Sequence, residues 1–282
     1  MTGILAAELL KLRKRWGIRI LALIFILVVV LLTYVLTYVI YKNPPPNFRE
    51  SLPKGTTPAD LIRELYPQNF HRIALSSVNG LGSAIAIILG VLATGSEYGW
   101  GTLKTIFTQK PSRATVFVGK FLALVIVALV FGLLLMVVAA ACSLVLSLLD
   151  GQYSQWPDAA VILQATGALW LILLLWTMFG VLLAVLFQQS ALAIGVGLVY
   201  GFVVEGLVFG LFGRSGGILT DIEKAFPGAN ATALTDHFGQ AVSRFSTPAP
   251  LVSVTQAVLV LSAYALAFLL VSTLLTVRRD LT

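Results

Sequence analysis

The sequence predicts an all-α integral membrane protein with six transmembrane helices, and three observations support this fold class. Hydrophobic residues make up 58% of the 282 residues and charged residues only 11%, whereas about a quarter of a soluble domain is charged. The mean hydropathy is +0.94. Six apolar runs are each long enough to cross a bilayer, which takes about 20 helical residues. We therefore interpret residues 1–282 as a single transmembrane domain.

The first 19 residues predict an amphipathic helix that lies in the membrane surface. Leu5, Leu9, Leu12 and Trp16 recur at steps of three and four, and five basic residues lie among and beside them. A nucleic-acid-binding arm is the alternative, but the segment adjoins a membrane span and has no folded domain beside it. We expect this segment to bind lipid and no nucleic acid.

The apolar runs give the boundaries of the six spans. The first run is too long for a cleavable signal peptide, and the apolar character of the third continues to Leu149. The predicted spans are Ile20–Tyr41, Ala74–Thr94, Phe121–Ser143, Val161–Phe187, Ala191–Phe212 and Leu251–Val277.

The basic residues favour an orientation with both termini in the cytoplasm. With the N-terminus inside, the inner segments hold eleven Lys and Arg residues and the longer outer loops hold eight. Acidic residues strengthen the contrast, because eight lie in the outer loops and three in the inner segments. We therefore predict a multi-pass protein of the cell membrane.

The stretch Gly95–Lys120 is the longest polar interruption on the predicted cytoplasmic side. Gly99-Trp100-Gly101-Thr102 is typical of a turn followed by a helix start, with Thr102 as N-cap. Lys110-Pro111 ends that helix, since the residue before a proline avoids the helical conformation. Its apolar face consists of Leu103, Ile106 and Phe107. Such a helix either lies on lipid or is held by a cytosolic partner.

Several catalytic motifs are missing from the sequence. It has no G-x-x-x-x-G-K-[ST] loop to bind nucleotide phosphates. Its two histidines, His71 and His237, are too far apart for an H-E-x-x-H metal site. We therefore expect no bound metal, and the missing motifs together lead us to expect no enzyme activity in this chain. Residues 213–217 match G-x-S-x-G, but they follow an apolar span and precede a glycine-rich loop rather than the strand and helix of a nucleophile elbow.

The fifth span carries the single ionisable residue that lies well inside an apolar run, Glu205. A carboxylate in lipid is costly, so we expect it to line a substrate path or to hydrogen-bond a neighbouring helix, and its depth slightly favours the second role. The same span has two small-residue pairs at a spacing that favours close helix packing, within the chain or across a dimer. These are Gly197 with Gly201 and Gly206 with Gly210.

Several residues around the polar stretch resemble the permease subunits of type-two ATP-binding-cassette (ABC) transporters. The matching positions are Glu97, Gly101-Thr102-Leu103-Lys104, Pro111-Ser112-Arg113 and Gly119-Lys120. The basic N-terminus, the six spans and the long loop before the sixth span extend the resemblance over nearly the whole chain. The sequence departs from the pattern in one respect, because the family's proline often lies one residue further from the arginine.

The resemblance implies a dimeric exporter whose second and fifth spans line the path of the cargo. The partner would be a separate cytosolic ABC ATPase that holds ATP and Mg²⁺, and this chain would need no cofactor. A cytoplasmic coupling helix between the second and third spans would dock on that ATPase. The coupling residues that it implies are Glu97, Gly101, Thr102, Leu103, Lys104, Ile106, Phe107, Pro111 and Arg113.

Two other functions stay open from the sequence. One is a secondary transporter driven by an ion gradient, a class in which repeated, interrupted spans and ionisable groups near the membrane centre are expected. The other is a membrane scaffold without transport activity.

Overall fold

The computed structural model describes residues 2–45, 48, 57–99, 113–152, 155–209, 218–239 and 250–278. These residues form helices and no strands, and six helical segments are long and apolar enough to cross a membrane. The six candidate spans are Trp16–Lys42, Pro67–Ser96, Thr115–Leu149, Ala159–Phe187, Ser190–Leu207 and Val254–Arg278. The predicted all-α fold with six spans is confirmed.

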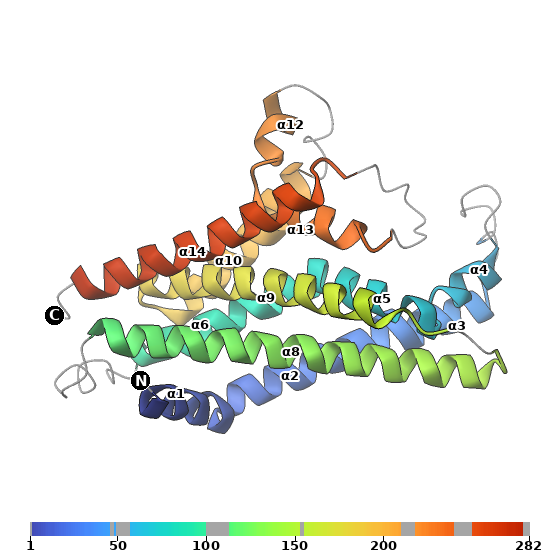
Figure 1. The fold of residues 1–282 in the computed structure, drawn as a ribbon, viewed down its shortest axis with the longest axis horizontal. Coiled ribbons are helices and arrows are strands. Elements are labelled where there is room, and N and C mark those ends of the chain that lie inside the picture. Colours follow the sequence, from blue (N-terminus) through green and yellow to red (C-terminus); the bar gives the residue numbers. More distant parts are fainter. Residues whose placement is uncertain are drawn as a thin grey trace.

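The six spans run along the long axis of the molecule (Figure 1). Helix α1 (Thr2–Lys14) begins and helix α14 (Val254–Arg278) ends at the same end of the bundle. We call this the termini end and the opposite one the loop end.

Three spans begin well before the predicted residue, and the first of them begins at Trp16 rather than Ile20. The third is helix α8 (Arg113–Leu149), whose 37 residues correspond to about 55 Å of helix. The second starts at Pro67 rather than Ala74. The apolar runs mark only the part of each helix that needs lipid around it, and a polar residue such as Lys120 continues the helix where other helices bury it.

Three spans change helix type along their length. The first consists of α2 (Trp16–Val28), a π-helical segment (Val29–Leu36) and α3 (Thr37–Lys42). The second contains α5 (Phe70–Ser77), a π-helical segment (Val78–Gly82) and α6 (Ser83–Gly99). In the fifth, α10 (Ser190–Val199) leads into a third π-helical segment (Tyr200–Phe209). Since π-turns often mark functional sites, these segments point to the first, second and fifth spans.

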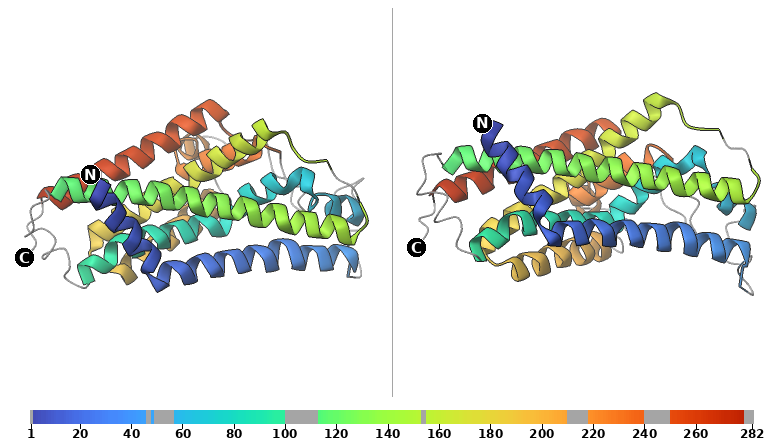
Figure 2. Two further views of the ribbon diagram at one scale, coloured as in Figure 1. Left: turned by 60° about the horizontal axis from the view of Figure 1, so that its bottom comes forward. Right: turned by 90° about the horizontal axis from the view of Figure 1, so that it is seen from below.

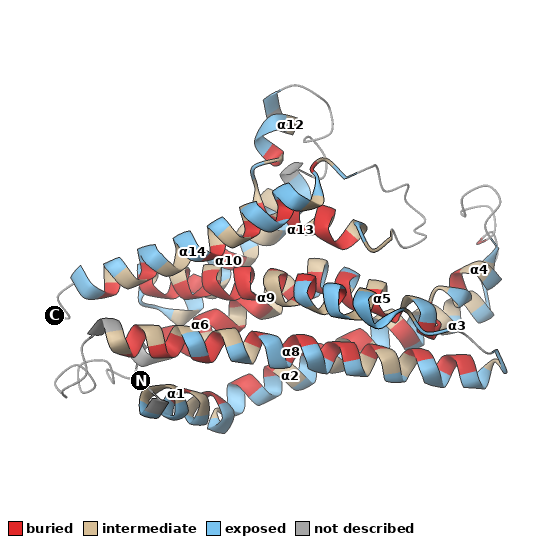
Figure 3. Ribbon diagram, in the orientation of Figure 1, coloured by how far each residue is buried: buried red, intermediate tan, exposed pale blue. Residues whose placement is uncertain are grey.

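The fourth span, α9 (Ala159–Phe187), forms the centre of the bundle. In the most apolar 18 residues of this span 72% are buried, whereas the corresponding share is 11% in the fifth span and 17% in the sixth. Figure 3 shows the buried residues of α9 enclosed by the surrounding helices. The outer spans keep apolar side chains exposed, for example Leu23 and Leu259, and these faces suit contact with lipid.

Two glycines bring the backbones of the second and fourth spans into contact. A methyl group on Gly90 of α6 would lie 2.0 Å from the carbonyl oxygen of Thr177, and one on Gly180 of α9 would lie 2.2 Å from that of Ile87. No side chain fits in either place, so α6 and α9 pack closely, as small residues allow in membrane proteins.

Helix α1 crosses the bundle obliquely at the termini end (Figure 2). Its apolar stripe lies partly against protein rather than wholly in the membrane surface, because Leu12 is buried and Leu5 and Leu9 pack against the core. Trp16 departs from the stripe and is 73% exposed at the start of the first span. The amphipathic pattern correctly predicts a helix, and this helix contacts α8.

Besides α1, three short helices of the described chain lie outside the six spans. Helix α4 (Pro58–Arg63) begins with a capping box between Thr57 and Asp60. Helices α12 (Ile218–Glu223) and α13 (Pro227–Asp236) connect the fifth and sixth spans. The buried Asn230 side chain donates hydrogen bonds to the carbonyl oxygens of Lys224 and Phe226, which fixes the start of α13.

Candidate functional site

The predicted coupling stretch joins two long helices at the termini end. Helix α6 ends at Gly99 and α8 begins at Arg113, so Glu97 lies in the last turn of α6 and Arg113 is the first residue of α8. The residues between them lie outside the described part of the chain. Their predicted roles stay predictions, and they are Gly101, Thr102, Leu103, Lys104, Ile106, Phe107 and Pro111.

Helix α1 and the residue that follows it contact the two helices that flank this stretch. The Arg15 guanidinium, just after α1, donates a hydrogen bond to the carbonyl oxygen of Leu92 in α6. On the other side, Ile4 lies against Gly119 of α8, where a methyl group would be 2.5 Å from the Ile4 Cγ2 atom. This bracing role could not be predicted from the sequence, because it depends on contacts between residues that are 77 and 115 positions apart.

A cavity of about 280 Å³ lies where the second and fifth spans meet α13. A second cavity of about 170 Å³ adjoins it between the same two spans, and Asn79, Gly201 and Gly206 line both. The larger one is lined by Asn79, Gly201, Glu205, Gly206, Glu223, Gly228, Ala229, Thr232, Ala233, Pro250 and Leu251.

The second and fifth spans separate at their π-helical segments. Towards the termini end, α6 and α10 are in contact, and a methyl group on Gly197 would lie 2.6 Å from the Ile87 side chain. Towards the loop end, Asn79 of one π-helical segment and Gly201 of the other both line the two cavities. The pair of spans therefore forms a cleft that is closed at one end by close packing.

Glu205 lies in this cleft with contacts to two elements. Its Oε1 atom accepts a hydrogen bond of 2.8 Å from the Tyr200 hydroxyl, five residues earlier in the same π-helical segment. Its Oε2 atom lies against the backbone of Gly228 in the first turn of α13, where a methyl group would be only 1.6 Å away. A carboxylate beside the start of a helix is favourable, because the amide groups there carry partial positive charge.

The Tyr200 ring also belongs to an aromatic cluster that joins three spans. Its centroid lies 4.9 Å from that of Phe179 in the fourth span and 6.3 Å from that of Trp176. Phe179 in turn lies 5.4 Å from Phe268 of the sixth span. Glu205 is thus held by a tyrosine whose own position is fixed by packing.

The glycines of the two predicted pairs in the fifth span differ in their surroundings. Gly197 is in tight contact with side chains of the same chain, whereas Gly201 has no atom within 4 Å of a methyl group built on it. A methyl group on Gly206 would meet the carbonyl oxygen of Gly201 at 3.5 Å. Gly210 lies outside the described residues. Close packing within the chain therefore accounts for Gly197, and space in the cleft for Gly201.

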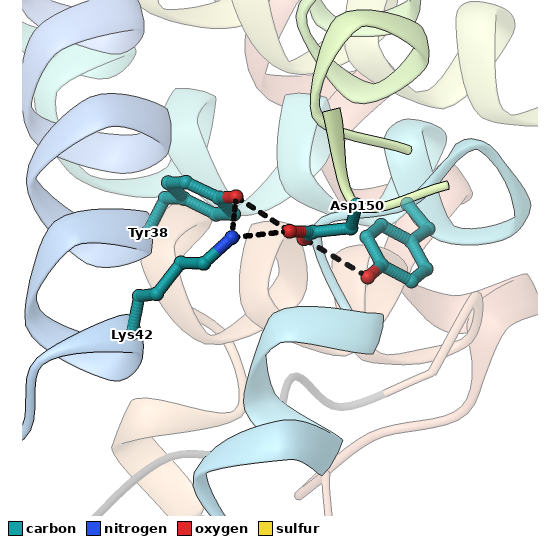
Figure 4. A network of polar contacts seen from close by, with 4 residues as sticks. Tyr38, Lys42 and Asp150 are labelled. Carbon is teal, nitrogen blue, oxygen red and sulfur yellow. Dashed lines mark hydrogen bonds and ion pairs between the residues drawn. The ribbon is translucent and has the colours of Figure 1, made fainter. Parts of the chain in front are cut away.

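A separate polar cluster lies at the loop end and joins the first and third spans (Figure 4). Asp150 accepts hydrogen bonds from Lys42 at 2.5 Å, from Tyr38 at 2.7 Å and from Tyr66 at 3.1 Å. Tyr38 and Lys42 belong to α3, Asp150 directly follows α8, and Tyr66 directly precedes the second span. We call these four residues the Asp150 cluster.

The donors of the Asp150 cluster set the protonation of its members. Burial raises the pKa of the Asp150 carboxyl, but the hydrogen bonds from Lys42, Tyr38 and Tyr66 outweigh burial and hold the pKa below its ordinary value. Burial and the neighbouring carboxylate raise the pKa of Tyr66 to about 12. At neutral pH the cluster is therefore a carboxylate with three donors, suited to tying helices together.

The comparisons with known proteins agree with this architecture. The family model described as ABC-2 family transporter protein matches residues 3–281, and a search of curated proteins found no significant match. The family match covers every described helix from α1 to α14 apart from one residue of α1. The structure has six apolar spans, and two long helices flank a polar stretch. Together with the match over nearly the whole chain, this shows that the protein belongs to the ABC-2 family of transporter proteins and is a membrane permease of the ABC type.

Proposed function

We propose that the chain is the membrane subunit of an ATP-driven exporter, which works as a dimer with a separate cytosolic ABC ATPase. The observation that carries the proposal is the family match, together with the placement of α6 and α8. These two helices would deliver residues 100–112 to the end of the bundle where α1 begins and α14 ends. The basic residues at that end favour an orientation in the cell membrane in which the termini end faces the cytoplasm.

In this proposal the stretch between α6 and α8 carries the motion of the ATPase to the spans. Leu103, Ile106 and Phe107 insert into a groove of the ATPase, as the apolar face of an amphipathic helix does in many complexes. Glu97, Lys104 and Arg113 orient the helix through charge pairs at the rim of the interface, which add little affinity but select the register. A push on the helix moves α6 and α8 together.

In this proposal the cleft between the second and fifth spans forms part of the path of the cargo. Asn79 and Glu205 give it polar groups, and Ile87, Leu198 and Phe202 give it apolar walls. Such a lining suits an amphipathic cargo. The family match favours this ATP-driven class over a secondary transporter and over a scaffold without transport.

Retention of the ATPase tests the proposal. Affinity-tagged permease is purified from cells of the organism that encodes it. The ATPase activity of the co-purifying protein is then measured for the wild type, Phe107→Ala and Lys104→Ala. We expect the phenylalanine variant to lose much more activity, because apolar anchors near the centre of an interface carry most of the binding energy. If Phe107→Asp retains all of the activity, the stretch does not dock the ATPase and the proposal fails.

A further inference from the structure

Arg72 is a charged residue within the second candidate span, two residues into α5. Its guanidinium makes no hydrogen bond or ion pair with any residue that the structure describes, and its Nε atom is buried. An arginine within a membrane span is costly and normally has a partner. The guanidinium, unpaired among the described residues, therefore points to a bound anionic group.

The fold holds the Arg72 guanidinium in a fixed place. Gly239, which follows α13, has a φ of +113°, and a methyl group on it would lie 2.5 Å from the Arg72 Cζ atom and 2.7 Å from Nε. Only glycine adopts this backbone conformation readily and allows so close a contact. The backbone of Gly239 thus covers one side of the guanidinium, which remains half-buried.

His71 adds a second polar group beside Arg72. Its side chain is only 4% exposed, and its Nδ1 atom is buried without a hydrogen-bond partner. The imidazole lies edge-on to the rings of Phe70 and Phe238, with centroids 5.9 Å and 6.2 Å away. Two neighbouring side chains from one turn of α5 thus have polar atoms without partners, and both of these groups donate hydrogen bonds to anions.

Aromatic residues place the pair at the depth of the lipid headgroups. Phe70 packs against Trp156, with ring centroids 5.7 Å apart, and Trp156 is 49% exposed in the loop between the third and fourth spans. Tryptophan gathers where the hydrocarbon region meets the headgroups. Arg72 lies five residues from the start of its span, so its side chain reaches the level at which lipid phosphates lie.

We propose that Arg72, assisted by His71, binds the phosphate of an anionic phospholipid headgroup at the loop end of the second span. A guanidinium forms two parallel hydrogen bonds to a phosphate, which gives both affinity and orientation. Inorganic phosphate offers the same oxygen atoms and is the alternative source of the anion. The site is separate from the cleft and the coupling stretch, so it stands whether or not the proposed transport function is correct.

Lipid binding to the purified full-length chain tests the proposal. Native mass spectrometry from detergent gives the affinity for phosphatidylglycerol, phosphatidylcholine and inorganic phosphate. We expect the wild type to prefer phosphatidylglycerol, and Arg72→Gln to weaken that binding roughly tenfold, as the loss of a charge-assisted pair of hydrogen bonds does. Arg63→Gln is the matched control, since Arg63 is exposed and already pairs with Asp60 at 3.6 Å, and its affinity should not change.

Two further variants separate binding from folding. Arg72→Lys keeps the charge but loses the paired hydrogen bonds, so we expect an intermediate affinity. Gly239→Ala displaces the guanidinium and should weaken lipid binding as Arg72→Gln does. Because Arg72 has no partner in the described chain, Arg72→Gln should leave the thermal midpoint of the lipid-free protein unchanged.

Each result supports the proposal or overturns it. Loss of phosphatidylglycerol binding in Arg72→Gln alone supports a lipid site, and an equal loss of phosphate binding supports a site for the free anion. Equal binding by the wild type and Arg72→Gln overturns the proposal, as does an equal loss in Arg63→Gln. A lower thermal midpoint of lipid-free Arg72→Gln together with unchanged lipid affinity would show that Arg72 has a structural role only.

Discussion

Single glycines set the distance between the second and fourth spans, and their replacement should be costly. In Gly90→Ala the new methyl group collides with the backbone of α9, and in Gly180→Ala with that of α6, where no flexible side chain can move away. Overpacking of this kind costs on the order of 1–3 kcal/mol. We expect both variants to lower the thermal midpoint of the purified protein, whereas Gly167→Ala, with no atom within 4 Å of the added methyl group, should not.

Glu205 should tolerate an amide but not an apolar side chain. In Glu205→Gln the new carbonyl oxygen still accepts the Tyr200 hydrogen bond, so we expect normal assembly. Glu205→Leu leaves the Tyr200 hydroxyl without its acceptor, at a cost of about 1–3 kcal/mol. The measurement is the thermal midpoint and the monodispersity of each variant in detergent. Normal values for the leucine variant would show that the carboxylate has no structural role.

At the residue scale, the sequence predicts which side chains matter better than it predicts what they touch. Glu205 is identifiable because a carboxylate in an apolar run is rare, and Gly90 because a glycine there suits close packing. Their partners, Gly228 and Thr177, lie 23 and 87 positions away, and no local pattern connects them. The place of Arg72 within a span was not predicted for a related reason, since Arg72 lies at the polar edge of an apolar run and resembles a loop residue.

At the scale of helices, the Asp150 cluster ties the first span, the third span and the start of the second together. Asp150→Asn replaces the carboxylate and weakens three hydrogen bonds. The Lys42 ammonium is half exposed and screened by solvent, so we expect a loss of only about 1 kcal/mol. Thermal unfolding at pH 7 measures it, and Asp158→Asn is the control, since Asp158 makes no side-chain capping bond at the start of α9.

The Asp150 cluster also predicts how stability depends on pH. The pKa of Asp150 is lower in the folded protein than in the unfolded chain, where it is about 3.9. Its contribution is therefore complete above that unfolded value and is lost as the pH falls through the lower folded value. We expect the difference in thermal midpoint between the wild type and Asp150→Asn to be constant from pH 8 to pH 5. A difference that already shrinks between pH 7 and pH 5 would contradict this assignment.

The residues at which the helices begin and end could be predicted only in part from the composition of the sequence. The fourth span is predicted to within two residues because it is apolar throughout, whereas α8 begins well before its apolar run. Polar residues such as Lys120 continue the helix because neighbouring helices bury them. The π-helical segments were not predicted either, since their sequences have the same apolar character as the α-helices beside them.

At the scale of the whole molecule, the positions of its polar stretches carry most of the functional argument. The order of spans and loops, the polar stretch after the second span and the missing phosphate-binding loop all follow from the sequence. The cleft between the second and fifth spans does not, because it depends on how two helices diverge beyond their contact at Gly197 and Ile87. The structure thus adds a cleft to an architecture that the sequence already indicates.

The account depends most on the docking of an ATPase at the stretch between α6 and α8, and site-specific photo-crosslinking in intact cells tests this directly. A photoreactive amino acid is placed at residue 107 in the full-length chain and, as controls, at Ile218 of α12 and at Leu163 of α9, which are both well exposed. Mass spectrometry then identifies the crosslinked proteins. We predict that residue 107 crosslinks to a protein with an ATP-binding cassette and that residues 218 and 163 do not. No crosslink to such a protein from residue 107, or an equal yield from residue 218, would contradict the account.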